Sequence, residues 1–146
     1  MKTEIIQILT GFIGSFGFAI LFNIRGKRLI MAALGGFLSW SLFIAFSQVF
    51  ESEHINYFFV SFIISIYAEI MARWLKTPTT TFITTSLVPL IPGSSLYYTM
   101  VYAFESNTED FMQKGLDTLL LASALALGII VAATVMKLIT KLSPLR

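Results

Sequence analysis

The sequence predicts an all-α integral membrane protein with five transmembrane helices, the fourth of them broken at Pro89–Gly93. Hydrophobic residues make up 56% of the 146 residues and charged residues only 12%, whereas an average soluble domain carries about 25% charged residues. Long apolar segments alternate with short polar connections, and about 20 apolar residues suffice to cross a bilayer. One of these segments has two prolines and a glycine at its centre. These observations predict a membrane-spanning bundle with one interrupted helix.

The predicted spans follow one another with little sequence between them. They cover about residues 5–24, 29–50, 55–75, 79–104 and 116–138. The connections are polar, and the longest runs from Glu105 to Gly115. Because so little sequence remains, residues 1–146 are predicted to form a single membrane domain.

The lysine and arginine residues predict the orientation of the chain. With five spans, eight of them fall on one side of the membrane: Arg25, Lys27, Arg28, Arg73, Lys76, Lys137, Lys141 and Arg146. Only Lys2 and Lys114 fall on the other side. Since lysine and arginine are enriched in cytoplasmic loops, the amino terminus is predicted outside and the carboxyl terminus in the cytoplasm.

Small residues gather in the first span. Gly11, Gly14 and Gly17 lie there, and Gly11 is four residues before Ser15. Small residues at such spacing let a second helix backbone approach closely, which drives helix association in lipid. We interpret these glycines as a packing face that specifies no chemistry.

Polar residues recur every four positions along the third span, at Tyr57, Ser61, Ser65, Glu69 and Arg73. This spacing keeps them near one helix face, which should point into the protein or a water-filled path rather than into lipid. An intramembrane carboxylate is a functional candidate by default, so Glu69, with Arg73, is a candidate for proton coupling. The alternative is a structural ion pair between these two residues, and the sequence leaves both interpretations open.

The fourth span is interrupted by Pro89, Pro92 and Gly93. A proline cannot bond the carbonyl four residues earlier, so the carbonyls of Thr85 and Val88 should lose their helical partners. A membrane helix broken in this way is the usual sequence pointer to a transporter's binding site. A proline kink that only shapes packing is the alternative.

A second half-helix is expected to begin after the break, with Ser94 and Ser95 as its caps. Its free amides and positive dipole end would form a site for a carboxylate. Tyr98 follows and offers a phenol, or belongs to an interfacial aromatic belt. The complete candidate set for substrate binding is Thr85, Pro89, Pro92, Gly93, Ser94, Ser95 and Tyr98.

Several kinds of site are excluded by composition. The chain has no cysteine and one histidine, His54, so neither a thiolate nor a multi-histidine metal site is expected. No motif of a hydrolase or a metalloprotease is present, which predicts no enzyme and no cofactor. A net charge of +2 argues against nucleic acid as a partner. His54 and the acidic cluster Glu105, Glu109, Asp110 and Asp117 are expected to be solvated, and Asn23 is expected to cap the first span.

Three segments together resemble a known family. They are Gly-Phe-Ala-Ile-Leu-Phe-Asn at 17–23, followed by basic residues, Ala-Arg-Trp-Leu-Lys-Thr-Pro at 72–78, and Val-Pro-Leu-Ile-Pro-Gly-Ser-Ser-Leu-Tyr-Tyr at 88–98. In order and spacing they resemble the threonine/serine exporter family over most of the chain, and in particular its small YjjB-type subunit. That subunit matches the carboxyl-terminal membrane half of single-chain exporters. Many relatives have a second glycine where Ser94 stands.

The resemblance implies secondary transport of small polar metabolites across the bacterial cytoplasmic membrane. Threonine and serine, or a dicarboxylate such as succinate, are the substrates that it implies, and a larger YjjP-type membrane subunit is the implied partner. A homo-oligomer is also left open. The small size and the glycine-rich faces support an alternative, a non-transporting scaffold or assembly subunit.

Overall fold

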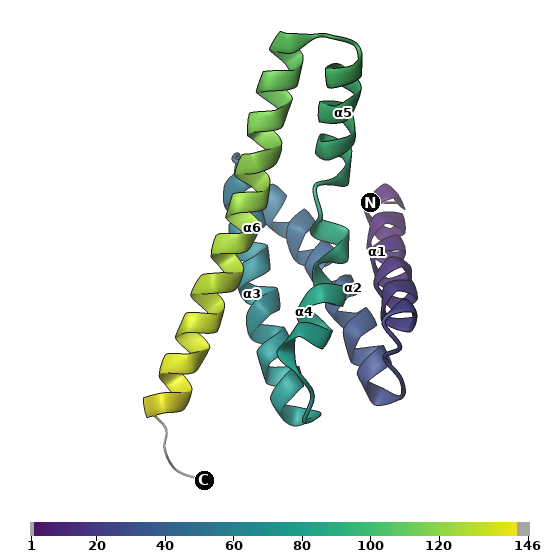
Figure 1. The fold of residues 1–146 in the computed structure, drawn as a ribbon. Coiled ribbons are helices and arrows are strands. Elements are labelled where there is room, and N and C mark those ends of the chain that lie inside the picture. The colour runs from purple at the N-terminus through teal and green to yellow at the C-terminus, as the bar shows by residue number, and fades with distance from the viewer. Residues whose placement is uncertain (1, 143–146) are drawn as a thin grey trace.

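The computed structural model describes residues 2–142, which form helices joined by short turns (Figure 1). In chain order the elements are α1 (Lys2–Leu21), α2 (Lys27–Ser47), α3 (Glu53–Trp74), α4 (Thr79–Leu87), the 3₁₀ helix η1 (Val88–Leu90), α5 (Gly93–Phe104) and α6 (Thr108–Leu142). Within this part, four helices are long and apolar enough to cross a membrane: α1, α2, α3 and α6. The all-helical prediction is therefore confirmed. Arg146, which contributes to the basic count, lies outside the described residues.

The long helices alternate in direction. The α1–α2 and α3–α4 turns lie at one end of the bundle, and the amino-terminal end of α1 lies toward the other (Figure 1). α4, η1 and α5 follow one another in the same general direction, so together they run from the end of α3 to the start of α6 (Figure 1). α6 packs against α5 and then against α3, its most extensive neighbour.

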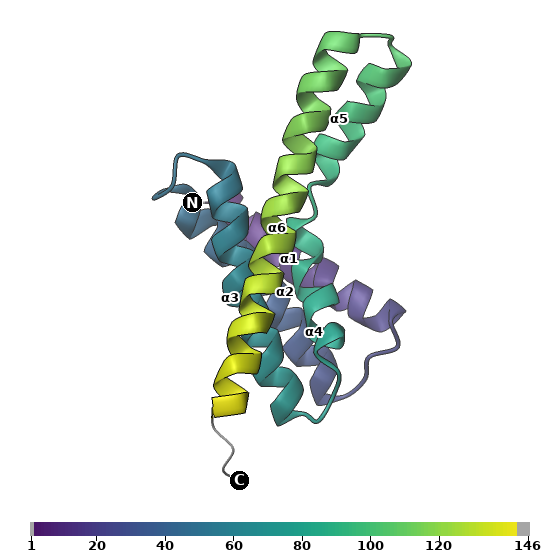
Figure 2. The ribbon, with the colours of Figure 1, turned by 60° about the vertical axis from the view of Figure 1, so that its left-hand side comes forward.

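The hairpin of α5 and α6 reaches beyond the other helices (Figure 2). Asp117 on α6 pairs with His54, which lies in the first turn of α3. Residues 108–116 of α6 therefore extend past the start of α3, by about 14 Å at 1.5 Å per residue.

Two adjacent glycines of α2 allow two other helices to pack closely against it. A Cβ at Gly36 would collide with the hydroxyl of Ser15 on α1, and a Cβ at Gly35 would collide with the hydroxyl of Ser86 on α4. Both serines are fully buried. Close approach at small residues is how membrane helices gain packing contacts in the absence of a hydrophobic driving force.

The same arrangement joins α3 to α6. A Cβ at Gly128 would collide with the Ser61 hydroxyl and lie 2.6 Å from the carbonyl oxygen of Phe58. Apolar side chains complete the interior around these contacts. The fully buried ones are Ala19, Ala32, Ala33, Val60, Ile64, Ala68, Phe82 and Leu90.

Asn23 ends α1 as predicted. Its φ of 58° is left-handed, its amide donates to the carbonyl of Ile20, and the Ile24 amide donates to the carbonyl of Ala19. This is the Schellman arrangement, which satisfies the last carbonyls of a helix.

The predicted connection from Glu105 to Gly115 is wrong, because α6 already begins at Thr108. The side-chain oxygen of Asn107 accepts the amide of Asp110 at 3.3 Å, and its side-chain nitrogen donates to the Asp110 carboxylate at 2.6 Å. A capping residue followed by acidic residues in the first turn stabilises a helix start. Glu109 and Asp110, which were interpreted as part of the connection, therefore belong to a capped helix, while Glu105 remains in the turn before it.

Candidate functional site

The break lies where the sequence predicts it. α4 ends at Leu87, η1 takes one short turn, and Ile91 is extended, with φ −62° and ψ 124°, before α5 begins at Gly93. The carbonyl of Val88 loses its α-helical partner but accepts the amide of Ile91 at 3.2 Å. This carbonyl is therefore not free, because the chain tightens into a 3₁₀ turn that supplies another donor.

The expected serine caps are wrong. The residue before α5 is Pro92, and no side chain caps this helix. Ser94 and Ser95 instead lie inside its first turn, after Gly93. The Leu96 amide donates to the carbonyl of Pro92 at 3.0 Å, whereas no group within residues 2–142 accepts the amides of Ser94 and Ser95. The start of α5 thus carries unsatisfied donors at the positive end of a helix.

The candidate residues do not converge in one enclosed site. Gly93, Ser94 and Tyr98 are exposed, Pro89 and Pro92 are half-buried, and Ser95 is buried. Thr85 is fully buried, and its hydroxyl contacts the carbonyls of Thr81 and Phe82 on its own helix. At the break, Gly93 and Ser94 therefore lie on an outer surface of the chain, whereas Ser95 faces inward.

A pocket adjoins the break between α1, α2 and η1. It has a volume of about 220 Å³ and is lined by Gln7, Thr10, Gly11, Gly14, Trp40, Val88 and Pro89. The indole N–H of Trp40 is buried and has no acceptor among the described residues. The pocket thus combines the polar side chains of Gln7 and Thr10 with apolar walls, which is the usual make-up of a small-molecule site.

Sequence reasoning missed this pocket. Gln7 and Thr10 are polar residues three positions apart in an apolar helix, a spacing that places them on one face. That signal was available. Their convergence with Trp40 and Pro89 depends on the packing of three elements and could not be predicted from spacing.

Glu69 lies away from the break, at the junction of α3 and α4. Its carboxylate pairs with Arg73 at 3.0 Å and accepts the hydroxyl of Thr79, the first residue of α4, at 2.7 Å. The Glu69 side chain is 25% exposed. Thr79 and Val88 are nine residues apart, which is about 14 Å along a helix. The structure thus contains the ion pair and ties it to α4, without bringing it to the break.

The rest of the polar stripe points into the bundle. Tyr57, Ser61 and Ser65 are all buried. The Ser61 hydroxyl donates to the carbonyl of Phe58, while the Ser65 hydroxyl has no partner within the described part of the chain. This part of the stripe therefore faces protein rather than lipid, as expected, whereas Arg73 at its end is exposed.

Comparison with known families decides what kind of protein carries this geometry. The family model described as "Threonine/Serine exporter, ThrE" matches residues 7–135. The chain belongs to the threonine/serine exporter family. No curated protein and no solved structure gives a match. The family is one of membrane transporters and not of enzymes.

In this member of the family, the three glycines of α1 have different surroundings. A Cβ at Gly11 would lie 3.2 Å from the Cβ of Trp40 on α2. At Gly14 and Gly17 it would meet nothing within 4 Å inside the described chain. Only Gly11 therefore packs against another helix of this chain.

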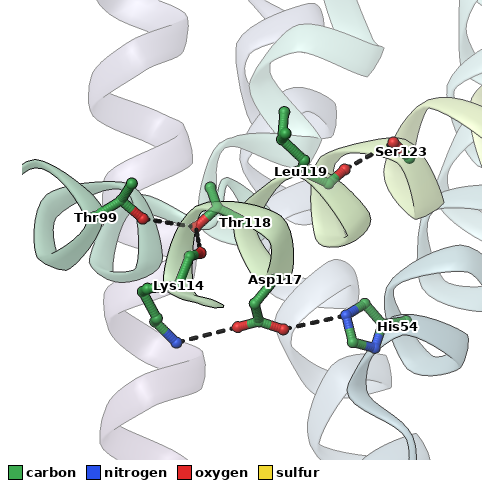
Figure 3. Close-up of polar contacts among 7 residues, drawn as sticks. All are labelled: His54, Thr99, Lys114, Asp117, Thr118, Leu119 and Ser123. Carbon is green, nitrogen blue, oxygen red and sulfur yellow. Dashed lines mark hydrogen bonds and ion pairs between the residues drawn. The ribbon is translucent and has the colours of Figure 1, made fainter. Parts of the chain in front are cut away.

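At the end of the bundle away from the α1–α2 turn, His54 and Asp117 are not simply solvated. They pair at 3.2 Å, and Lys114 pairs with the second oxygen of Asp117 at 3.1 Å (Figure 3). Nearby, the hydroxyls of Thr99 on α5 and Thr118 on α6 are 3.2 Å apart (Figure 3). These contacts join α3 and α5 to the same stretch of α6. The sequence prediction failed because His54 and Asp117 are distant along the chain.

Proposed function

We propose that this chain is the small, YjjB-type subunit of a heteromeric secondary transporter in the bacterial cytoplasmic membrane. It exports small polar metabolites that carry a carboxylate, either threonine and serine or a dicarboxylate such as succinate. The observation that carries the proposal is the interrupted α4–η1–α5 segment, in an exporter family, with unaccepted amides at the start of α5.

Five crossings follow if α4, η1 and α5 count as one span. α4 has 9 residues and α5 has 12, so neither is long enough alone, but residues 79–104 together suffice. The basic residues of the α1–α2 and α3–α4 turns then mark the cytoplasmic side, and the amino terminus lies outside. Since the chain has no native cysteine, the orientation is testable with single cysteines. A thiol introduced by Lys27→Cys should react with an impermeant maleimide only from the cytoplasm, and one introduced by Glu53→Cys only from outside.

The substrate carboxylate binds at the amides of Ser94 and Ser95. Backbone donors at the positive end of a helix form a ready anion site, and transporters use such half-helix ends for substrate carboxylates. Pro89 connects this point to the neighbouring pocket of Gln7, Thr10 and Trp40, which offers room for the rest of a small substrate. Tyr98 on the exposed face of α5 supplies a phenol.

A second surface is needed to enclose this site. Gly93 and Ser94 are exposed, and Gly14 and Gly17 have open space in front of them. A larger YjjP-type subunit whose membrane part has the inverted topology would cover these residues and place the site between two halves. Association of identical chains is the alternative way to cover them.

Glu69 couples transport to protons. Its carboxylate holds Arg73 and also Thr79 at the start of the broken span. Protonation would remove the charge that pairs with Arg73 and weaken the contact with Thr79. Protonation of the Glu69 carboxylate would thereby affect the segment that binds the substrate.

Substitution at Ser94 tests the binding site. Ser94→Pro removes one amide N–H in the first turn, where proline is compatible with a helix, and the preceding glycine limits the steric cost. Loss of one hydrogen bond to a carboxylate should weaken substrate affinity about ten- to hundredfold, measured by flux in the purified complex reconstituted in liposomes.

Ser94→Ala is the matched control, since it removes the hydroxyl and keeps the amide. It should leave affinity within about twofold. If Ser94→Pro assembles normally and transports as well as Ser94→Ala, the carboxylate does not bind there. An assembled wild-type complex with no flux at all would favour the scaffold alternative.

A further inference from the structure

Two polar pockets adjoin each other at the end of the bundle that holds the α1–α2 and α3–α4 turns. One has a volume of about 390 Å³ and is lined by Phe22, Asn23, Ile24, Arg25, Arg28, Thr77 and Thr81. The other has a volume of about 200 Å³ and is lined by Phe22, Ile24, Thr80, Thr81 and Thr84. Because three residues line both, the two form one depression between the turn that follows α1 and the first half of α4, which we call the α1–α4 groove.

The groove is positively charged. Arg25 and Arg28 line it, and no carboxylate is among its lining residues. Within residues 2–142, neither arginine pairs with an acidic group. The Arg25 Nε donates to the side-chain oxygen of Asn23 at 2.9 Å, which orients its guanidinium beside the groove. Two guanidinium groups thus remain available for an anion.

The opposite wall of the groove consists of threonine hydroxyls. Thr77 and Thr84 donate to the carbonyls of Leu75 and Thr80. The hydroxyls of Thr80 and Thr81 make no hydrogen bond within the described residues. These two hydroxyls therefore remain free to bind a polar ligand.

The α4 residues that line the groove lie on the same side of the helix as Val88 at the break. Thr81, Thr84 and Val88 follow at spacings of three and four, which places them along one side of the segment. Val88 lines the pocket at the break, and Thr81 and Thr84 line the groove. The groove therefore lies near the start of α4 and the pocket just past its end, both beside the face of this segment that holds Thr81, Thr84 and Val88.

We propose that the α1–α4 groove is the cytoplasmic loading site, where Arg25 and Arg28 bind the substrate carboxylate before it reaches the break. A guanidinium binds a carboxylate through two parallel hydrogen bonds, and the hydroxyls of Thr80 and Thr81 contact the polar remainder of the substrate. This inference rests on the proposed exporter function and orientation, and it adds a second binding site to them.

The absence of native cysteine makes the groove open to a direct test. Thr81→Cys introduces the chain's only thiol where the two pockets meet, in everted membrane vesicles that retain any partner. Its reaction rate is measured with an anionic (sulfonatoethyl) and a cationic (trimethylammonioethyl) methanethiosulfonate. The positive groove should favour the anionic reagent, and adding Arg28→Gln or Arg25→Gln should lower the anionic-to-cationic rate ratio about three- to tenfold. Lys27→Gln is the matched control, because Lys27 carries the same charge in the same turn and is not a lining residue.

Substrate protection supplies the second measurement. L-Threonine should slow labelling of this thiol, L-threonine methyl ester should not because it lacks the carboxylate, and Arg28→Gln should abolish the protection. The proposal is overturned if the methyl ester slows labelling as much as L-threonine does, or if Lys27→Gln changes the rate ratio as much as Arg28→Gln does. It is also overturned if only added phosphatidylglycerol slows labelling, because the groove would then be a lipid headgroup site. Protection without flux in the reconstituted complex would contradict the exporter function and leave the binding site in the groove supported. Flux without protection would support the exporter function and contradict the site in the groove.

Discussion

The boundary between α3 and α6 and the boundary between α1 and α4 are built in opposite ways. α3 and α6 make the most extensive helix contact of the described chain, whereas direct contacts between α1 and α4 are sparse. At the first boundary Gly128 lies directly on Ser61 and the backbone of Phe58. Near the second, one pocket lies at the break and another at the α1–α2 turn.

This difference separates a tightly packed support from a part of the bundle that has room for a substrate. A close glycine contact leaves no space for a ligand or for rearrangement, because packed interiors are not continuously deformable. A boundary with pockets, free hydroxyls and unpaired donors provides room and polar partners for a small molecule. The proposed path for the substrate therefore follows α1 and α4, with α3 and α6 as its support.

The largest effect is expected from filling the tight boundary. Gly128→Ala places a methyl group against the backbone of Phe58 and should destabilise the protein by about 2–3 kcal/mol, measured by unfolding in detergent. Gly14→Ala is the control, since its methyl group meets nothing within 4 Å and alanine favours the helix. Equal stability of the two variants would show that the boundaries do not differ in tightness.

The next largest effect is expected at Glu69, where α3 contacts the start of α4. Glu69→Gln removes the charge that pairs with Arg73 but keeps an oxygen to accept the Thr79 hydroxyl. If Glu69 couples transport to protons, flux driven by a proton gradient should fall about tenfold and lose its pH dependence, because the side chain no longer changes charge.

Thr79→Val is the companion variant, which keeps the carboxylate and removes only the hydroxyl. Because this hydroxyl links the Glu69 carboxylate to α4, Thr79→Val should also weaken the pH dependence of flux while the ion pair with Arg73 stays in place. A Glu69→Gln protein with reduced stability and an unchanged pH profile would assign the ion pair a purely structural role.

The smallest effect is expected at the turn between α3 and α4. Lys76 ends α3 with a left-handed φ of 49°, which glycine adopts without steric cost. Lys76→Gly should therefore stabilise the protein by about 0.5–1 kcal/mol. Lys137→Gly, the same change inside α6, should destabilise it by about 1 kcal/mol. Unfolding of both in detergent checks the opposite signs, and a loss of stability in both would contradict the assignment of the turn.

The sequence was informative where local chemistry decides the structure. The break follows from the geometry of Pro89 and Pro92, and the end of α1 follows from the tolerance of Asn23 for a left-handed backbone. It misled where two local signals compete. Pro92 takes the position before α5, so the serines expected to cap this helix lie inside it.

Other features could not be predicted because they depend on distant contacts. The pairing of His54 with Asp117 requires α3 and α6 to pack side by side. The pocket at the break requires Trp40 on α2 to meet Gln7 on α1. The pairing of Gly128 with Ser61 is equally invisible in the sequence, since neither residue is unusual in a membrane helix.

One uninterrupted helix connects the two ends of the protein. α6 has 35 residues, which is about 52 Å, and it contacts α3 at two well-separated points, Asp117 beside His54 and Gly128 against Phe58. These two points are 11 residues apart, or about 16 Å along the helix. Because α6 has no break between them and α5, the hairpin beyond α3 is attached to the rest of the bundle through one continuous helix.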